Sequence, residues 1–506
     1  MPTLREALAN LPAQARVQGR DDVVVAGVGA DSRLIRPGDL FVAVRGLTDD
    51  GHRYIPDALA HGARAIVSEQ PPPPGQETPW VTVPDAREAL GWLAAQFHGF
   101  PSRRLGVIGV TGTDGKTTTT HLIGAMLEAA GWPVGLISTV QFNLGEERRP
   151  NDTPHTTPPA PMIQGLLAEM VARGLRWVVL EVSSHALAQA RVAGCAFDIA
   201  AFTNLTPEHQ NYHGDFERYR GEKARLFAML GREPKEGVPS FGVFNTDDPS
   251  SDVLRAVCPA EQIGYGIDTM TDYRVTGFRS EPDGTTIQLD TPEGALELRS
   301  PLDGRFNVYN VAAASAVALR LGVPGEAVAR ALRGFSRVPG RLQRIDRGEP
   351  FQVFVDFAHT PNALSAVLAT LRGRTTGRLI VVFGHPGERD PQNRRQIGEV
   401  ASAQADFLVL TYDDPYDEDP KAVLDQIEGA VLATGRRPER DYLRVDDRPG
   451  AIAAALRLAA PGDTVLIAGR GHLEYTVVRG RKSPLSDVEL ARRELQRLRE
   501  TATPSG

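Results

Sequence analysis

The sequence predicts an α/β protein built from three domains. The chain has 506 residues, about three times the ~150 residues of a typical domain. Short apolar segments alternate with segments of helical periodicity, which is typical of a strand–helix–strand architecture. This alternation is interrupted near residues 101 and 337, so we predict domains at 1–101, 102–337 and 338–506.

The first domain is predicted to be a small α/β unit. Helices are expected at Tyr54–His61 and at Ala86–Phe97. The second of these is followed by Gly99 and Pro101, which end helices and here indicate a domain boundary. The predicted strands are the short apolar segments Val23–Ala26, Leu40–Val44 and Ala65–Ser68.

The second domain repeats a strand–loop–helix pattern. Helices are expected at Lys116–Ala130 and Asn310–Leu321. The alternation predicts a mostly parallel, doubly wound sheet. The predicted strands are Leu105–Val110, Trp177–Glu181 and Ile199–Thr203.

The third domain restarts the same alternation and is predicted to be a Rossmann-like unit. Its predicted strands are Val353–Asp356, Leu379–Phe383, Phe407–Leu410 and Thr464–Ile467. Its predicted helices lie at about 361–372, 392–404, 421–434 and 449–460.

Composition excludes several classes of protein. The formal charge is −7, from 56 Lys and Arg against 63 Asp and Glu, so neither nucleic acid nor an anionic membrane is the expected partner. Cys195 and Cys258 are too few for a disulfide scaffold or a cysteine zinc site. The sequence contains no apolar run of ~20 residues, and its first residues lack the apolar core of a signal peptide. We expect a cytoplasmic enzyme that does not insert into membranes.

A glycine-rich segment at residues 109–118 has the context of a phosphate-binding loop, because it follows an apolar strand and opens a helix. Backbone N–H groups and the helix N-terminus would hold the phosphates, Lys116 would neutralise their charge, and the Thr117 hydroxyl would bind Mg²⁺. One departure is that Val110 stands where the general pattern has glycine. The alternative is an ordinary turn with a chance lysine. The residues expected to bind nucleotide are Gly112, Thr113, Asp114, Gly115, Lys116, Thr117 and Thr118.

The loop alone does not fix the reaction, since kinases, hydrolases and ligases all use it. Further segments narrow the choice: Asp31–Arg33, Glu181–His185, Lys223–Phe227, Gly304–Asn310 and Ala468–His472. With the loop, and in this order along nearly the whole chain, they resemble the Mur ligase family.

This resemblance implies three domains that bind UDP, ATP and an amino acid in turn. It implies an ATP-dependent ligase that adds the third amino acid of the peptidoglycan stem peptide to UDP-N-acetylmuramoyl-L-alanyl-D-glutamate through an acyl phosphate. The partners would be these two substrates, and we expect a monomer. The alternatives are a folate polyglutamylase of the same superfamily and a non-catalytic, nucleotide-binding paralogue that acts as a partner subunit.

The resemblance also implies catalytic and metal-binding residues. Lys116 and Thr117 would act with Glu181 at a first Mg²⁺ ion, and His209 would bind a second. Lys223 falls where the family has a carbamylated lysine, which turns a cation into an anionic metal ligand. The alternatives are a salt-bridged Glu181, a capping or core His209, and a Lys223 on a solvated helix face. The stretch around His209, beginning at Glu208, departs from the family pattern.

The remaining positions carried over from the family concern the two other ligands. Those for the nucleotide-linked substrate are Ser32, Arg33, Thr156, Thr157, Ser183, Gln189 and Arg191, and the alternative for the threonine pair is a plain loop. Those for adenosine are Asn307, Arg341 and Asp356. Asp356 is placed at the end of a predicted strand, where ribose hydroxyls are usually held in doubly wound sheets.

The identity of the added amino acid rests on a departure from the family. Members that add meso-diaminopimelate usually have Asp-Asn-Pro-Arg, whose arginine binds the extra carboxylate; this chain ends the same stretch in Tyr416. Arg389 matches the arginine for the incoming α-carboxylate. Asp413 and Asp414 open an acidic run, 413–419, that favours a side chain with a lone ammonium. We therefore expect L-lysine or L-ornithine; the alternatives are meso-diaminopimelate and a run that is merely solvated.

Overall fold

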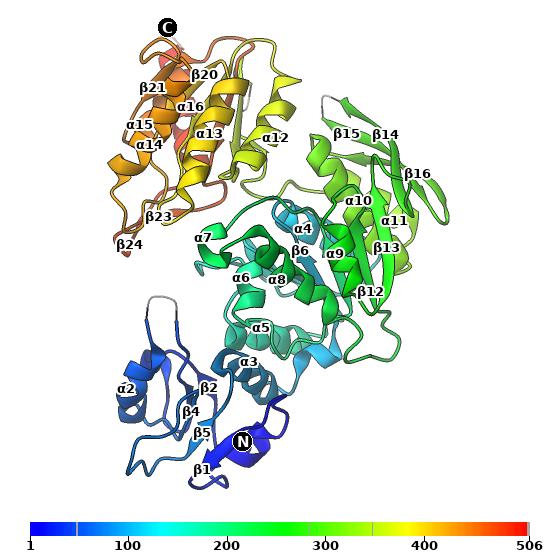
Figure 1. The fold of residues 1–506 in the computed structure, drawn as a ribbon. Coiled ribbons are helices and arrows are strands. Elements are labelled where there is room, and N and C mark those ends of the chain that lie inside the picture. Colours follow the sequence, from blue (N-terminus) through cyan, green and yellow to red (C-terminus); the bar gives the residue numbers. More distant parts are fainter. Residues whose placement is uncertain (47–48, 282, 347, 503–506) are drawn as a thin grey trace.

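The computed structural model describes residues 1–46, 49–281, 283–346 and 348–502. It confirms the α/β class, with three large sheets that follow one another along the chain and a separate two-stranded hairpin near residues 475–484. The N-terminal domain lies at one end of the molecule and the C-terminal domain at the other, with the central domain between them (Figure 1). The predicted domain boundaries fall between the sheets, at the 3-10 helix Pro101–Arg104 and after the helix Gly325–Arg333.

The N-terminal sheet has the order β1-β5-β4-β3-β2 and is parallel except for β1. The expected strand Val23–Ala26 is wrong: Val23 and Val25 form backbone hydrogen bonds with Leu4 and Pro2, so this segment pairs with the start of the chain through an isolated bridge. The strands are β1 (Arg16–Gln18), β2 (Val28–Gly29), β3 (Leu40–Val42), β4 (Ala65–Ser68) and β5 (Trp80–Thr82). The helices are α1 (Leu4–Leu8), α2 (Ile55–Ala60) and α3 (Ala86–Phe97), with 3-10 turns at Ser32–Leu34 and Gly51–Tyr54.

The central sheet has the order β16-β15-β14-β13-β12-β11-β6-β10-β7-β8-β9. It is parallel from β14 to β7 and antiparallel at both edges. Its strands are β6 (Gly106–Thr111), β7 (Val134–Ile137), β8 (Gln141–Asn143), β9 (Arg148–Pro150), β10 (Trp177–Glu181), β11 (Ile199–Phe202), β12 (Phe241–Asn245), β13 (Glu261–Gly266), β14 (Tyr273–Glu281), β15 (Gly284–Thr291) and β16 (Gly294–Ser300).

Helices cover both faces of this sheet and form two cores. One core includes buried residues of α4 (Lys116–Ala129), α10 (Arg305–Arg320) and α11 (Gly325–Arg333). The other includes residues from helices on the opposite face, namely α5 (Ala160–Ala172), α6 (Ser184–Ala188), α8 (Phe216–Ala228) and α9 (Ser251–Ala256). The short α7 (Gln210–His213) precedes α8. Two covered faces explain why the central strands are apolar throughout, as predicted.

The C-terminal sheet has the order β17-β18-β22-β19-β20-β21 and is parallel except for β17. A two-stranded hairpin, β23–β24, stands apart from it. The strands are β17 (Gln343–Arg344), β18 (Gln352–Asp356), β19 (Leu379–Phe383), β20 (Phe407–Leu410), β21 (Tyr442–Arg444), β22 (Thr464–Ala468), β23 (Tyr475–Val478) and β24 (Arg481–Pro484). The helices are α12 (Pro361–Arg372), α13 (Pro391–Gln404), α14 (Pro420–Ala433), α15 (Arg448–Leu458) and α16 (Asp487–Ala502).

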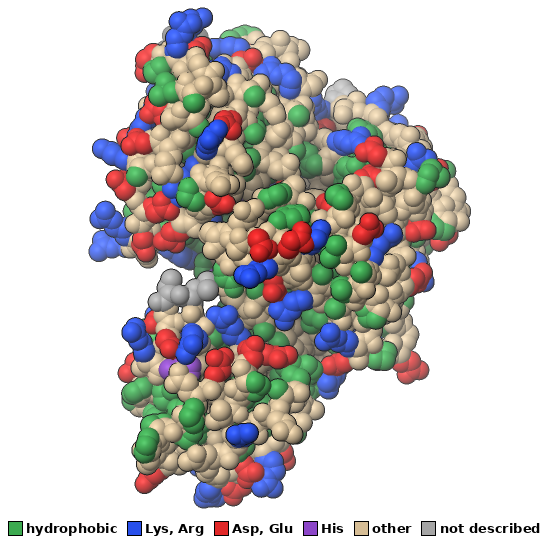
Figure 2. Space-filling model, viewed as in Figure 1, with side chains coloured by type: hydrophobic (Ala, Val, Ile, Leu, Met, Phe, Trp, Pro, Cys, Tyr) green, Lys and Arg blue, Asp and Glu red, His purple; other side chains and the backbone are tan. Residues whose placement is uncertain are grey.

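Acidic and basic side chains are interspersed on the molecular face shown in Figure 2. That distribution agrees with the small net charge. Within the described ranges, none of the helices combines the length and apolarity needed to cross a bilayer.

Candidate active site

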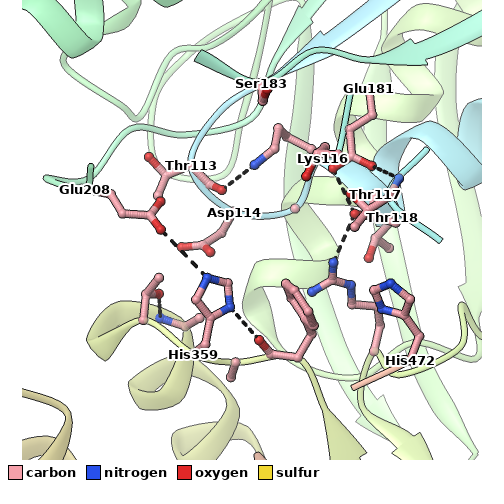
Figure 3. Close-up of a pocket in the computed structure, with 18 of the residues that line it drawn as sticks. Thr113, Asp114, Lys116, Thr117, Thr118, Glu181, Ser183, Glu208, His359 and His472 are labelled. Carbon is pink, nitrogen blue, oxygen red and sulfur yellow. Dashed lines mark hydrogen bonds and ion pairs between the residues drawn. The ribbon is translucent and has the colours of Figure 1, made fainter. Parts of the chain in front are cut away.

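A cavity of about 830 Å³ lies between the central and C-terminal domains. It collects predicted residues that are up to about 300 positions apart in the sequence. The predicted residues that line it are Thr113, Asp114, Gly115, Lys116, Thr117, Thr118, Thr156, Glu181, Ser183, Gln189, Arg191, His209, Lys223, Asn307, Arg341, Asp356, Arg389 and Asp414. Figure 3 shows the phosphate-loop side with the residues of the C-terminal domain that face it.

Two positions of the phosphate loop require glycine, because neighbouring atoms lie too close to leave room for a side chain. Gly112 has φ 151°, and a Cβ there would lie 1.9 Å from the Thr203 hydroxyl; Gly115 has φ 82°, and its Cβ would lie 2.3 Å from Asn310 Oδ1. Gly109, in contrast, lies inside β6 and packs against the core. The loop therefore begins after β6, which accounts for the valine at position 110.

The carboxyl ends of β6 and β10 bring Thr117 and Glu181 together. Thr117 Oγ1 donates to Glu181 Oε1 at 3.0 Å, and Glu181 Oε2 accepts from the Thr139 N–H at 2.9 Å. A hydroxyl beside a buried carboxylate supplies the oxygen ligands that Mg²⁺ prefers, so these residues fit the ion. Among the described residues there is no cluster of three His, Cys, Asp or Glu side chains able to hold a metal.

Arg341 reaches this point from the C-terminal domain. Its Nη2 donates to Thr117 Oγ1 at 3.1 Å. Its Nε is buried and has no hydrogen-bond partner within the described part of the chain. Burial lowers the pKa of Arg341 from its usual value, although Asp356 and Glu181 oppose that shift. A buried guanidinium with a spare donor beside the phosphate loop fits an anionic ligand such as a nucleotide phosphate.

Lys116 and Lys223 both point to the backbone of the phosphate loop. Lys116 Nζ donates to Thr113 O at 2.6 Å, and Lys223 Nζ donates to Gly112 O at 2.7 Å. Lys223 lies on α8 and is 1% exposed, so it is not the solvated helix-face lysine of the alternative interpretation. Burial and the nearby Lys116 lower the pKa of Lys223 well below its usual value.

His209 occupies the left-handed region, with φ 57°, and precedes α7. Its ring packs edge-on against His185, with 4.7 Å between the ring centroids. Burial, followed by the charge of Arg389, lowers the pKa of His209 well below 6.5. A neutral imidazole can act as a metal ligand.

The loop before α5 and the end of α6 form the part of the cavity nearest to the N-terminal domain. The buried Thr157 does not line the cavity; its hydroxyl donates to Glu181 O at 2.8 Å and fixes the loop behind Thr156. Arg191 Nη1 donates to Thr157 O at 2.9 Å, and its Nη2 donates to Gln189 Oε1 at 2.7 Å. Gln189 and Arg191 are thus held in fixed positions at the cavity wall.

Asn307 of the central domain and Asp356 of the C-terminal domain both line the cavity. Asn307 Nδ2 donates to Asp303 O at 2.7 Å and its Oδ1 accepts from Asn310 at 3.0 Å. Asp356 accepts backbone N–H bonds from Leu342 and Ala358, at 2.5 and 2.7 Å. Burial raises the pKa of Asp356, while Arg341 acts in the opposite direction.

Asp413 and Asp414 do not lie on an open acidic rim, which corrects the sequence-based expectation for these two residues; Asp417 and Asp419 are exposed but do not line the cavity. Asp413 and Asp414 are 7% and 4% exposed and form ion pairs with the buried Arg470. Burial alone would raise the pKa of Asp413, but Arg448 and Arg470 outweigh it and hold the pKa below its usual value. Asp413 lies beneath the cavity, and only Asp414 lines it. A buried charge is costly unless it is paired, so the two aspartates that enter the interior pair with Arg470 instead of facing solvent.

Two strained residues hold the loops beside Arg389. Glu388 and Tyr416 have φ values of 56° and 52°, which side chains other than glycine rarely adopt. The Gly387 N–H donates to Asp414 O at 2.8 Å and joins the two loops. Arg389 and Tyr416 thereby line the same end of the cavity.

Several lining residues were not singled out as binding residues from the sequence. From the sequence, His359 is expected either to line the adenosine site or to stand at the start of a helix; it lines the cavity, and its Nε2 lies 3.9 Å from Glu208 Oε1 (Figure 3). Its Nδ1 lies 2.9 Å from Phe357 O. The histidine of the Gly-Arg-Gly-His segment, His472, also lines the cavity. Tyr475 and Lys482 come from the hairpin, for which the sequence prediction had no element.

Ser32 and Arg33 lie in the N-terminal domain and do not line this cavity. Ser32 is buried at the start of a 3-10 turn, and Arg33 pairs with Asp31 at 2.7 Å while its side chain stays 84% exposed. A ligand that touched both regions would have to extend from this domain to the cavity.

Three family models match consecutive parts of the chain. Residues 24–98 match the Mur ligase family catalytic domain, residues 110–318 the Mur ligase middle domain, and residues 340–471 the Mur ligase glutamate ligase domain.

Curated relatives align over almost the full length. A UDP-N-acetylmuramyl-tripeptide synthetase of Roseiflexus sp. (strain RS-1) is 44% identical and covers 94% of this chain and 95% of its own. A UDP-N-acetylmuramoyl-L-alanyl-D-glutamate--2,6-diaminopimelate ligase of Geobacillus thermodenitrificans (strain NG80-2) is 42% identical, with the same coverage. A solved structure of a ligase with that second name is 30% identical, with a TM-score of 0.67 and coverage of 98% of this chain and 99% of the other.

Proposed function

Because the chain belongs to the Mur ligase family and is an ATP-dependent ligase, we propose that it adds the third amino acid to UDP-N-acetylmuramoyl-L-alanyl-D-glutamate. One observation carries this proposal. A single cavity joins the phosphate loop and Glu181 of the central domain to Arg389 and Tyr416 of the C-terminal domain. In such a ligase, the same carboxylate is first phosphorylated and then joined to an amine. The residues that bind ATP and those that bind the amino acid must therefore lie around one cavity.

In the proposed reaction, a carboxylate of the glutamyl residue attacks the γ-phosphorus of ATP and ADP leaves. The incoming amine then attacks the acyl carbon of the acyl phosphate, phosphate leaves, and the amine loses a proton. Lys116 and Arg341 would place positive charge beside the transferred phosphoryl group, where charge neutralisation and positioning supply most of the catalysis. Asn307 and Asp356 would hold the adenosine.

Thr117 and Glu181 would hold a first Mg²⁺ ion, and His209 with Lys223 a second. Bound Mg²⁺ would neutralise phosphate charge. Lys223 fits this role only after carbamylation, because a buried ammonium beside Lys116 would repel a cation, whereas a carbamate supplies anionic oxygen. The burial of Lys223 and its lowered pKa support this, since the neutral amine is the form that reacts with CO₂.

The nucleotide-linked substrate would extend from the N-terminal domain to the cavity. We propose that Ser32 and Arg33 contact its uridine. The residues between that domain and the phosphate loop would hold its diphosphate, sugar and peptide: Thr156, Thr157, Ser183, Gln189 and Arg191. The side-by-side placement of Gln189 and Arg191 supports this assignment.

For the amino acid we propose a dibasic residue with one carboxylate, L-lysine or L-ornithine. Tyr416 lines the cavity where a second carboxylate would require an arginine. Three buried carboxylates, Asp413, Asp414 and Asp487, stand against the two guanidinium groups of Arg448 and Arg470. When all five are ionised the cluster keeps one negative charge, which favours an ammonium nearby.

The test is a panel of amino acids. Phosphate release and tripeptide formation should require ATP, UDP-N-acetylmuramoyl-L-alanyl-D-glutamate and an amino acid together, with L-lysine or L-ornithine preferred. Preference for meso-diaminopimelate would overturn the choice of amino acid, and turnover of folates would overturn the substrate class.

The Lys116→Ala variant distinguishes a catalytic ligase from a non-catalytic scaffold protein. Ligation should fall by orders of magnitude, because the phosphate loop loses a positive charge. Lys421→Ala, on the exposed start of α14, serves as the matched control. Absence of ligation in the wild-type protein, or full ligation by Lys116→Ala, would refute the proposed enzyme.

A further inference from the structure

The β23–β24 hairpin is fastened to the loop that carries Asp414 and Tyr416. Asp414 Oδ1 accepts from the Thr476 hydroxyl at 2.8 Å and from the Val477 N–H at 3.2 Å. The Tyr416 N–H donates to Val477 O at 3.2 Å, and the Arg479 N–H donates to Tyr416 O at 2.8 Å. The hairpin and the amino-acid end of the cavity therefore form one bonded unit.

The two faces of this hairpin have different surroundings. Side chains alternate along a strand, so Tyr475 and Val477 share one face with their cross-strand neighbour Lys482. These three residues line the cavity. Arg481 lies on the opposite face, is exposed, and does not line the cavity.

Lys482 connects this unit to the central domain. Its Nζ lies 4.1 Å from the centre of the Tyr475 ring and donates to Asp152 O at 3.3 Å. Asp152 belongs to the loop that leads to Thr156 and Thr157, and that loop is ordered by Asn151, which donates to Ser138 O and to His155 O. The Lys482 side chain thus contacts the loop that we propose binds the nucleotide-linked substrate. The hairpin that carries Lys482 is hydrogen-bonded to the loop that we propose binds the amino acid.

We propose that Lys482 is a positioning residue that makes the amino-acid pocket depend on the substrate loop of the central domain, and that the hairpin shields the acyl phosphate from water. The inference rests on the proposed function. With the Lys482–Asp152 contact made, the hairpin closes over the cavity and fixes Asp414 and Tyr416 for the incoming amine. Without it, the hairpin leaves the central domain and opens the cavity on that side.

Opening of the hairpin should have a chemical consequence that can be measured. An acyl phosphate exposed to solvent is attacked at its acyl carbon by water, phosphate leaves, and the original carboxylate is regenerated with loss of a proton. The sum is ATP hydrolysis without a peptide bond. Exclusion of water until the amine arrives prevents this side reaction.

The test measures phosphate released per tripeptide formed, together with the KM for the amino acid. In Lys482→Met, which keeps the apolar stem, we expect that ratio to rise above the wild-type value of about one phosphate per peptide bond. We also expect the KM for the amino acid to rise by about threefold to tenfold, from the loss of one solvent-exposed hydrogen bond. Arg481→Met removes the same charge from the opposite face and should match the wild type, and Lys482→Arg should restore coupling.

Unchanged coupling and KM in Lys482→Met, or equal changes in Lys482→Met and Arg481→Met, would overturn the inference while leaving the proposed function intact. A wild-type protein that forms no tripeptide would instead overturn the proposed function. Thermal unfolding of the variants serves as the folding check. As a second measurement, hydrogen exchange of residues 475–484 should slow on addition of the nucleotide-linked substrate in the wild type and not in Lys482→Met.

Discussion

The most informative single residue in the cavity is Lys223. A lysine on a helix is normally solvated, but this one is 1% exposed and faces the carbonyl of Gly112. An ammonium there would stand close to Lys116 without a carboxylate in direct contact among the described residues. Conversion to a carbamate removes that conflict of charges.

This leads to a prediction at the residue scale. Removal of dissolved CO₂ and bicarbonate should lower ligation by the wild-type protein, and added bicarbonate should restore it, because carbamylation is reversible. Lys223→Ala should lose ligation by orders of magnitude and show no response to bicarbonate. The measurement is tripeptide formation in degassed and bicarbonate-supplemented buffer; a wild-type rate independent of bicarbonate contradicts the carbamate.

At the scale of elements, the terminal helix α16 is joined to the C-terminal sheet by a buried ion pair. Arg448, at the start of α15, donates from Nε and Nη2 to both carboxylate oxygens of Asp487, at 2.8 and 2.7 Å, and their side chains are 3% and 0% exposed. Arg448 Nη2 also donates to Ala468 O at the end of β22. The pair therefore links two helices to the strand that precedes the Gly-Arg-Gly-His segment.

Removal of one partner should be costly, because it leaves a buried charge uncompensated. We expect Asp487→Asn to lower the free energy of unfolding of the C-terminal domain by about 3–5 kcal/mol, measured by urea denaturation. The exposed pair Arg492–Glu489 on the same helix offers the control, since Glu489→Gln should change stability by less than about 1 kcal/mol. Equal effects of the two substitutions would show that α16 does not depend on the buried pair.

At the scale of the whole molecule, the active cavity exists only where two domains meet. Arg341 contacts Thr117, Asn362 lies 3.4 Å from Asp114, and Lys482 contacts Asp152. These contacts are polar, which is typical of domain interfaces that open and close. The conformation described here has the C-terminal domain placed on the phosphate loop.

We expect ligands to favour this arrangement over more open ones. Small-angle scattering should show a smaller radius of gyration when a non-hydrolysable ATP analogue and the nucleotide-linked substrate are added together than in the free protein. Lys116→Ala, with weakened nucleotide binding, should compact less at the same concentrations. An unchanged radius of gyration in the wild type at saturating ligand would contradict closure.

The sequence by itself determined the three-domain α/β architecture and the phosphate loop, because both depend on local signals. Apolar strands covered on two faces, helix-ending glycines and the Gly-Lys-Thr spacing are visible without any contact between distant residues. The predicted strands Trp177–Glu181 and Leu379–Phe383 match the structure, and most other predicted elements lie within one or two residues of their observed bounds, although α10 begins at Arg305 and not at Asn310. The buried parallel strands β7, β12 and β13 and the helices α5, α8 and α11 were not predicted. The three-stranded antiparallel edge at Tyr273–Ser300 and the β23–β24 hairpin were missed, since their strands are half exposed and carry a weak apolar pattern.

Only the tertiary structure decided how charges are partnered. In the sequence, Asp413 and Asp414 look like part of an exposed acidic run, yet Arg470, more than fifty residues away, pairs with both in the interior. Likewise nothing near Lys482 in the chain indicates that it reaches Asp152, 330 positions earlier. Burial and ion pairing arise when segments distant in sequence pack together, so the electrostatics of the site belong to the fold and are not contained in any local motif.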